Sequence, residues 1–153
     1  MLRLLGARRR GVGSADAGHE AVVEFLKRMG VDAKDWSLQD GSGLSRSDLL
    51  TPHEMAGLLV AMDRHPHAAA FRATLPVAAQ DGTLKNRMRG TAAEGRLVAK
   101  TGTLRHVNAL AGYVTTRGGS RLAFSIMVNH HTGGGAPATA AIDEIGALLA
   151  ALP

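Results

Sequence analysis

The four residues Lys100-Thr101-Gly102-Thr103, here called the KTGT segment, combine groups that can stabilise developing negative charge. They follow the apolar run Leu97-Val98-Ala99, which is expected to form a strand. A lysine ammonium supplies fixed positive charge, and a threonine hydroxyl can hold a carboxylate. The glycine leaves room for a ligand along the strand edge, and the next N–H can help to form an oxyanion hole. An ordinary strand-to-turn lysine is the alternative interpretation, so other motifs must decide.

A second polar segment, Asp-Gly-Ser-Gly-Leu-Ser-Arg at residues 40–46, is called the DGSGLSR loop here. Its polar side chains are candidates for the wall of a cleft: Asp40, Ser42, Ser45 and Arg46. The other interpretation is a structural turn that Asp and Gly stabilise, because these residues favour turn geometry. Both interpretations stay open at the level of the sequence.

Other chemistry-bearing residues indicate no metal or cofactor site. His65-Pro66-His67 and His130-His131 lack an HExxH pattern or an acidic partner at ligand spacing, so we expect surface histidines. His106 lies three residues after Thr103, and a solvated turn is the preferred interpretation over a place at the mouth of a cleft. The stretch 90–96 departs from a phosphate-binding loop, with Arg96 where lysine is needed.

The elements that would position these residues follow from periodicity and from start and stop signals. An opening helix should end at Gly6, and turn signals fill residues 30–50. Further helices are expected over 15–29, 52–65, 68–73 and 138–152, and strands over 96–101, 109–116 and 121–128. In the last helix, Ile142, Ile145, Leu148 and Leu149 should form one apolar side. Helices followed by an antiparallel sheet and a covering helix predict the α+β class.

Composition excludes several classes of protein. The chain has 153 residues with 45% hydrophobic residues and a net charge of +5, which fits one domain or a large piece of one. Its zero Cys exclude disulfides and Cys-ligated zinc. Only five aromatic residues (Phe 3, Trp 1, Tyr 1) disfavour a base-stacking platform, so no nucleic acid partner is expected. No apolar run reaches the roughly 18–20 residues of a membrane span, and the apolar start is too short for a signal peptide.

The ordered series of motifs resembles a known family. The DGSGLSR loop, Thr51-Pro52, Asp81-Gly82-Thr83-Leu84, Arg87, the KTGT segment and Leu110-Ala111-Gly112-Tyr113 follow one another as in the D-alanyl-D-alanine carboxypeptidase/endopeptidases. These are the class C low-molecular-mass penicillin-binding proteins, peptidase family S13, and the similarity is to their C-terminal portion. The resemblance covers nearly the whole chain.

This resemblance implies the transpeptidase fold of penicillin-binding proteins and serine β-lactamases. It also implies serine-type hydrolysis of peptidoglycan stem peptides through an acyl-enzyme, without a cofactor, at a periplasmic or extracytoplasmic location. β-Lactams are then expected ligands of the full-length parent. The family contains both carboxypeptidases and endopeptidases, and the motifs fit either.

Of the three family motifs, the chain contains only K-T-G. No serine is followed by Lys three residues later or by Asn two residues later, so S-x-x-K and S-x-N are missing and no nucleophile can be assigned. We therefore expect residues 1–153 to be a partial penicillin-binding domain, inactive by itself. The alternative is a non-catalytic basic module that binds cell-wall polymer or another polyanion.

Overall fold

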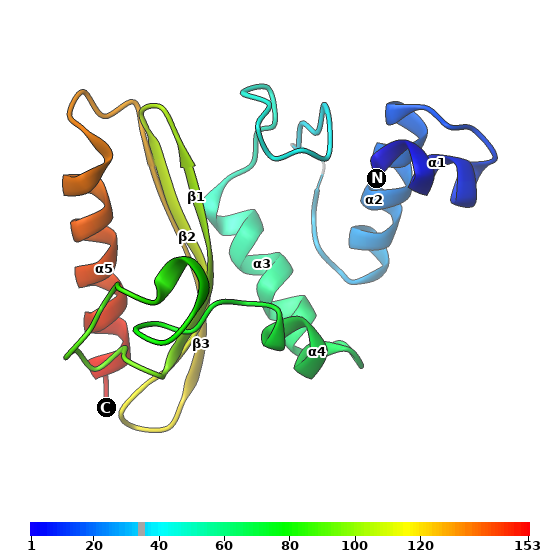
Figure 1. The fold of residues 1–153 in the computed structure, drawn as a ribbon. Helices are drawn as coiled ribbons and strands as arrows, with labels where there is room; N and C mark the ends of the chain where they lie inside the picture. Colours follow the sequence, from blue (N-terminus) through cyan, green and yellow to red (C-terminus); the bar gives the residue numbers. More distant parts are fainter. Residues whose placement is uncertain (34–35) are drawn as a thin grey trace. The chain divides into compact units, whose positions relative to one another are not determined.

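A computed structural model describes residues 1–33 and 36–153, which form two compact units, residues 1–61 and 62–153 (Figure 1). Helices come first, then an antiparallel sheet and a closing helix, which confirms the predicted α+β class. Lys34 and Asp35, within the stretch predicted to turn, lie outside the described residues. Within the described part of the chain, no helix is both long and apolar enough to cross a membrane.

The first unit begins with two packed helices, α1 (Leu2–Arg10) and α2 (Ala15–Arg28). The prediction that the opening helix stops at Gly6 is wrong, because α1 continues to Arg10 and ends at Gly11 with φ 72°. Gly6 is buried, and a Cβ there would lie 2.7 Å from the Val12 carbonyl oxygen and 2.8 Å from the Gly18 nitrogen. Gly6 is therefore needed for close packing rather than for a left-handed helix stop.

Two predicted helix starts in this unit are confirmed by their hydrogen bonds. Ser14 Oγ accepts from the Ala17 N–H at 3.1 Å at the start of α2. At α3 (Pro52–Asp63), the Thr51 N–H donates to Glu54 Oε2 at 2.7 Å, and the Glu54 N–H donates to Thr51 Oγ1 at 3.2 Å. This reciprocal pair is a capping box, which satisfies two backbone donors that the first turn leaves without partners.

The second unit contains α4 (Ala68–Ala73), a 3₁₀ turn η1 (Gly82–Leu84) and a three-stranded antiparallel sheet in the order β1-β2-β3. The strands are β1 (Leu97–Leu104), β2 (Val107–Thr115) and β3 (Arg121–Asn129). All three predicted strands are present. However, β1 continues past Thr101, where the prediction ended it, because its last residues pair with β2 up to a two-residue turn.

Helix α5 (Gly135–Ala151) covers one face of the sheet (Figure 1). The core of the unit lies between them and includes Leu97, Leu110, Val114 and Phe124 from the strands with Ile142, Gly146 and Ala150 from α5. Of the predicted apolar side, Ile142 is 1% exposed and Leu149 packs on this core. Ile145 and Leu148 are 43% and 63% exposed, so the prediction is wrong for both. The buried stripe uses small residues, because Gly146 lies close under Leu97.

Candidate functional site

The KTGT segment lies inside β1, at one edge of the sheet. Side chains alternate between the two faces of a strand. Leu97 and Ala99 are fully buried in the core that α5 covers. Lys100 and Gly102 therefore share the opposite face with Val98, and both are exposed. Lys100 therefore lies at an accessible strand edge, and the opposite face of this strand packs on the core.

The hydrogen bonds around β1 define which backbone groups remain available. The Thr115 N–H donates to the Arg96 carbonyl at 3.0 Å, so even-numbered β1 residues exchange bonds with β2. The Ala99 N–H donates to the Pro76 carbonyl at 3.0 Å, on the outer side. By the same alternation, the N–H and C=O groups of Thr101 and Thr103 point away from β2.

Backbone bonds from residues 76–78 cover the outer side of β1 at its start. The Ala78 N–H donates to the Leu97 carbonyl at 2.9 Å, and Val77 forms an isolated bridge with Val98. Within the described residues, no bridge of this kind reaches the KTGT segment. The segment thus presents an edge to which an extended peptide could add as a further strand.

Two contacts involve the first two residues of the KTGT segment. Lys100 Nζ donates to the Thr101 carbonyl at 2.6 Å. Thr101 Oγ1 lies 3.1 Å from Thr83 Oγ1, which η1 supplies. The sequence alone does not indicate a role for Thr83, although this residue belongs to one of the motifs of the family series. Together these contacts place one ammonium and two hydroxyls at the same edge.

The DGSGLSR loop belongs to the first unit, and its polar groups bond mainly within the loop. Asp40 Oδ1 accepts from the Ser42 N–H at 2.7 Å and from the Ser42 hydroxyl at 2.8 Å. These bonds to Ser42 hold the pKa of the Asp40 carboxyl below its usual value. Ser42 Oγ accepts from the Leu44 N–H, and Ser45 Oγ from the Ser47 N–H. These bonds fit a structural turn, but Asp40 and Ser42 also line a hollow of about 370 Å³ together with α1, so both interpretations of the loop stay predictions. Arg46 is exposed.

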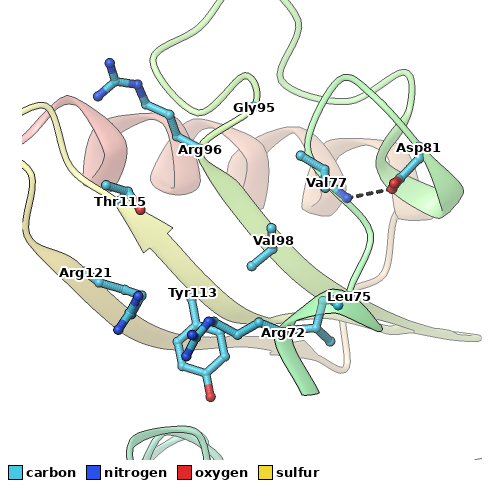
Figure 2. Close-up of a pocket in the computed structure, with 11 residues that line it drawn as sticks. Arg72, Leu75, Val77, Asp81, Gly95, Arg96, Val98, Tyr113, Thr115 and Arg121 are labelled. Carbon is cyan, nitrogen blue, oxygen red and sulfur yellow. Dashed lines mark hydrogen bonds between the residues drawn. The ribbon is translucent and has the colours of Figure 1, made fainter. Parts of the chain in front are cut away.

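A cavity of about 550 Å³ opens on the Val98 face of the sheet (Figure 2). Arg72 and Arg121 lie beside Tyr113 at one side of it. Both arginines pair with Asp63, at 2.6 Å and 3.1 Å, so the positive charge is partly compensated. Burial, and then the Asp63 charge, raise the pKa of Tyr113. The phenol is therefore neutral at physiological pH, and the cavity has a mixed lining of charged, polar and apolar side chains.

Two histidines near the KTGT segment, His106 and His131, make contacts that the sequence does not predict. His106 lies in the β1–β2 turn as expected, but its Nδ1 lies 2.8 Å from the His131 carbonyl oxygen. His131 Nε2 lies 2.8 Å from Oδ1 of Asn108, whose side chain is buried. Within the described residues, no group of three potential ligands could hold a metal ion.

The comparison with known proteins identifies the family. Residues 1–151 match the profile of the D-Ala-D-Ala carboxypeptidase 3 (S13) family. The chain belongs to this family. The resemblance inferred from the motif series is thereby confirmed over almost the full length.

Individual relatives agree with this assignment. A D-alanyl-D-alanine carboxypeptidase from an Actinomadura species is 45% identical over 149 residues, which are 94% of this chain and 27% of that protein. The D-alanyl-D-alanine carboxypeptidase DacB of Haemophilus influenzae is 32% identical over 79% of the chain and 26% of its own length. The chain thus spans about a quarter of the length of these two relatives.

The fold matches part of a solved penicillin-binding-protein structure. Penicillin binding protein 4 (dacB) of Haemophilus influenzae superposes with a TM-score of 0.87 at 27% identity, covering 99% of this chain and 36% of that one. A second structure of the same protein, in complex with a β-lactam, gives a TM-score of 0.86 at 28% identity over 94% of this chain and 36% of that one. The expected penicillin-binding-protein fold is confirmed.

Proposed function

We propose that this chain forms the substrate-binding and oxyanion-binding part of a serine-type D-Ala-D-Ala peptidase, a carboxypeptidase or endopeptidase that acts on peptidoglycan stem peptides. The observation that carries the proposal is the open outer edge of β1 at the KTGT segment, in a chain of the S13 family. An extended stem peptide would bond this edge as an added strand. Work on peptidoglycan would place the protein outside the cytoplasm.

The Thr103 N–H is the proposed oxyanion donor. It points away from β2 and follows Gly102, where a substrate meets no Cβ. The carbonyl oxygen of the scissile bond would accept this hydrogen bond, and the bond would strengthen as the tetrahedral intermediate becomes an anion. A donor on a strand with a packed core behind it is already oriented before the reaction.

Lys100 and the two threonine hydroxyls would bind and polarise the substrate. The Lys100 ammonium has three donors, and the bond to the Thr101 carbonyl uses one of them. The other two can face an anion at the same edge. When one hydroxyl of the Thr83–Thr101 pair donates to the other, the second proton remains free to bond the terminal carboxylate of a stem peptide.

The nucleophile of this reaction would come from a longer polypeptide. In this chain no serine is followed three residues later by lysine, the spacing that places serine and base together in the family. The proposed serine would attack the carbonyl between the two D-alanines and release the terminal one. Water would then hydrolyse the acyl-enzyme.

A chimeric enzyme tests the proposal. The matching region of the Actinomadura carboxypeptidase would be replaced by residues 1–151 of this chain. We expect the chimera to be labelled covalently by a fluorescent penicillin and to release D-alanine from a stem pentapeptide. The 153-residue chain alone should show no covalent adduct in intact mass spectrometry, because it lacks the serine motif.

A chimera that melts cooperatively but is neither labelled nor active would overturn the proposal. Should that host fail to fold, the Haemophilus protein provides a second one with the same readouts. A penicillin adduct on the isolated chain would also contradict the motif assignment. Binding of peptidoglycan fragments by the isolated chain, together with an inactive chimera, would support a non-catalytic basic module instead.

A further inference from the structure

The tip of the β1–β2 hairpin carries an unusual backbone conformation. Arg105 and His106 form a two-residue turn between Leu104 and Val107. His106 has φ 63°, in the left-handed region, where residues other than glycine are uncommon. Such a residue persists only when its surroundings hold it. The turn begins two residues after Thr103, the proposed oxyanion donor, so its geometry bears on the site.

The His106 conformation is held from the loop that follows β3. His106 Nδ1 lies 2.8 Å from the His131 carbonyl oxygen, within reach for an N–H of the ring to donate. On the other side of this bond, His130 has φ 56°, so a second left-handed residue directs the His131 carbonyl. The turn and the loop therefore fix each other through one hydrogen bond between two strained segments.

The His131 side chain extends this connection into the core. Its Nε2 lies 2.8 Å from Asn108 Oδ1, and its Nδ1 lies 3.0 Å from the Gly133 carbonyl oxygen. Asn108 Nδ2 in turn donates to Thr139 Oγ1 of α5 at 3.2 Å. Asn108 is only 4% exposed, so leaving its amide without partners would be costly. The side chain of Asn108 is thus fixed from both the loop and the helix.

Asn108 is the direct cross-strand partner of Thr103. The alternation that turns the Thr103 N–H outward also makes this pair a non-hydrogen-bonded one, in which the two side chains approach most closely. Movement of Asn108 would therefore be transmitted to Thr103 through side-chain packing. No backbone hydrogen bond between these two residues opposes such a movement.

We propose that Asn108 and His131 are positioning residues for the KTGT segment: the His106–His131–Asn108–Thr139 chain of hydrogen bonds holds the Thr103 end of β1 against α5. The inference rests on the proposed function for its catalytic consequence. Neither residue needs to touch the substrate. Their effect would be on the orientation of the Thr103 N–H, so the chemical step should respond more than substrate affinity.

A first experiment needs no enzymatic activity. In the 153-residue chain, Asn108→Leu and His131→Leu remove the hydrogen bonds at similar volume. Amide exchange at Leu104 and Val107 should become about tenfold faster, because a hydrogen bond of ordinary strength corresponds to roughly that factor. The Thr103 amide resonance should shift or broaden, while exchange at Ala99 stays unchanged. His131→Gln, whose amide can replace Nε2, should restore most of the wild-type behaviour.

A second experiment measures the effect of the same substitutions on acylation of the chimera. Asn108→Leu and His131→Leu should slow acylation about 10- to 100-fold at saturating penicillin, as expected for a small misplacement of a reacting group. The penicillin concentration that gives half the maximal acylation rate should change little. His131→Gln should recover the wild-type acylation rate. Thr132→Ala is the matched control in the same loop, since Thr132 is exposed and does not belong to the His106–His131–Asn108–Thr139 chain of bonds.

The two experiments separate the inference from the proposed function. Unchanged Thr103 and turn amides in folded Leu variants would overturn the inference, whatever the chimera does. An inactive wild-type chimera alongside altered amides would contradict the proposed function and leave the structural coupling supported. Equal loss of activity in His131→Gln and His131→Leu would also count against a hydrogen-bonded positioning role.

Discussion

The two units of the chain hold their polar motifs by different means. In the first unit, glycine-mediated packing joins α1 to α2, and the DGSGLSR loop bonds mainly to itself. In the second unit, the KTGT segment belongs to a strand whose other face is buried under α5. A loop held by local bonds can move without unfolding its unit, whereas a strand edge moves only with its core. The difference makes the second unit the better platform for oriented catalytic groups.

The largest expected effect is on the core behind β1. Leu97→Ala removes a fully buried side chain and should lower the free energy of unfolding by about 2–5 kcal/mol. Leu26→Ala, in the smaller cluster of the first unit, should fall toward the lower end of that range, because a smaller core collapses more easily around a cavity. Chemical denaturation followed by residue-resolved hydrogen exchange would check both. Equal losses of unfolding free energy in the two variants would contradict this difference between the two units.

The next largest effect is a loss of acylation rate without a loss of stability. Lys100→Ala in the chimera should slow penicillin acylation about 10²- to 10³-fold, the usual cost of losing an electrostatic group at the reacting carbonyl. The melting temperature should hardly change, because Lys100 is exposed. Lys27→Ala, an exposed lysine on α2, is the matched control and should leave the acylation rate intact. Near-normal acylation by the Lys100 variant would show that this lysine is only a surface residue.

A smaller effect tests the glycine packing of the first unit. A Cβ at Gly18 would meet the Leu2 carbonyl group, so Gly18→Ala should destabilise the α1–α2 pair by roughly 1–3 kcal/mol through overpacking. Gly57→Ala, on α3, meets nothing within 4 Å and should instead stabilise by roughly 0.5–1 kcal/mol. Thermal melting and helix content by circular dichroism would distinguish them. Two substitutions with the same sign of effect would refute the close-packing explanation.

The smallest effect is a local dependence on pH. The folded pKa of Asp40 is lowered by its bonds to Ser42, so its stabilising contribution is present above the unfolded pKa. That contribution is lost as the pH falls through the folded pKa. Exchange of the Ser42 amide, after correction for the intrinsic rate, should therefore accelerate on acidification below the ordinary Asp range. Asp40→Asn should abolish this dependence, and the β1 amides should not share it.

Local patterns were sufficient for most of the fold. The Thr51–Glu54 capping box and the Ser14 cap are short-range hydrogen-bond arrangements, so their residues can be recognised without the partners of the helix. The glycines were harder to interpret. Gly6 and Gly11 both suit a helix end, and only the approach of α2 to Gly6 distinguishes them. The prediction for Ile145 and Leu148 was wrong for a similar reason. Close packing at Gly146 determines which side of α5 faces the sheet, and this leaves both residues exposed.

The sequence by itself determined the family, the order of the elements and the KTGT segment, because residue type and short-range spacing carry that information. It also showed that the serine motifs are missing from these residues. Only the tertiary structure decided that the Thr103 N–H faces outward and that Thr83 lies beside Thr101. The connection of His131 to Asn108 likewise joins residues from different strands and loops. Such contacts depend on how segments far apart in the sequence pack against one another, which no local pattern encodes.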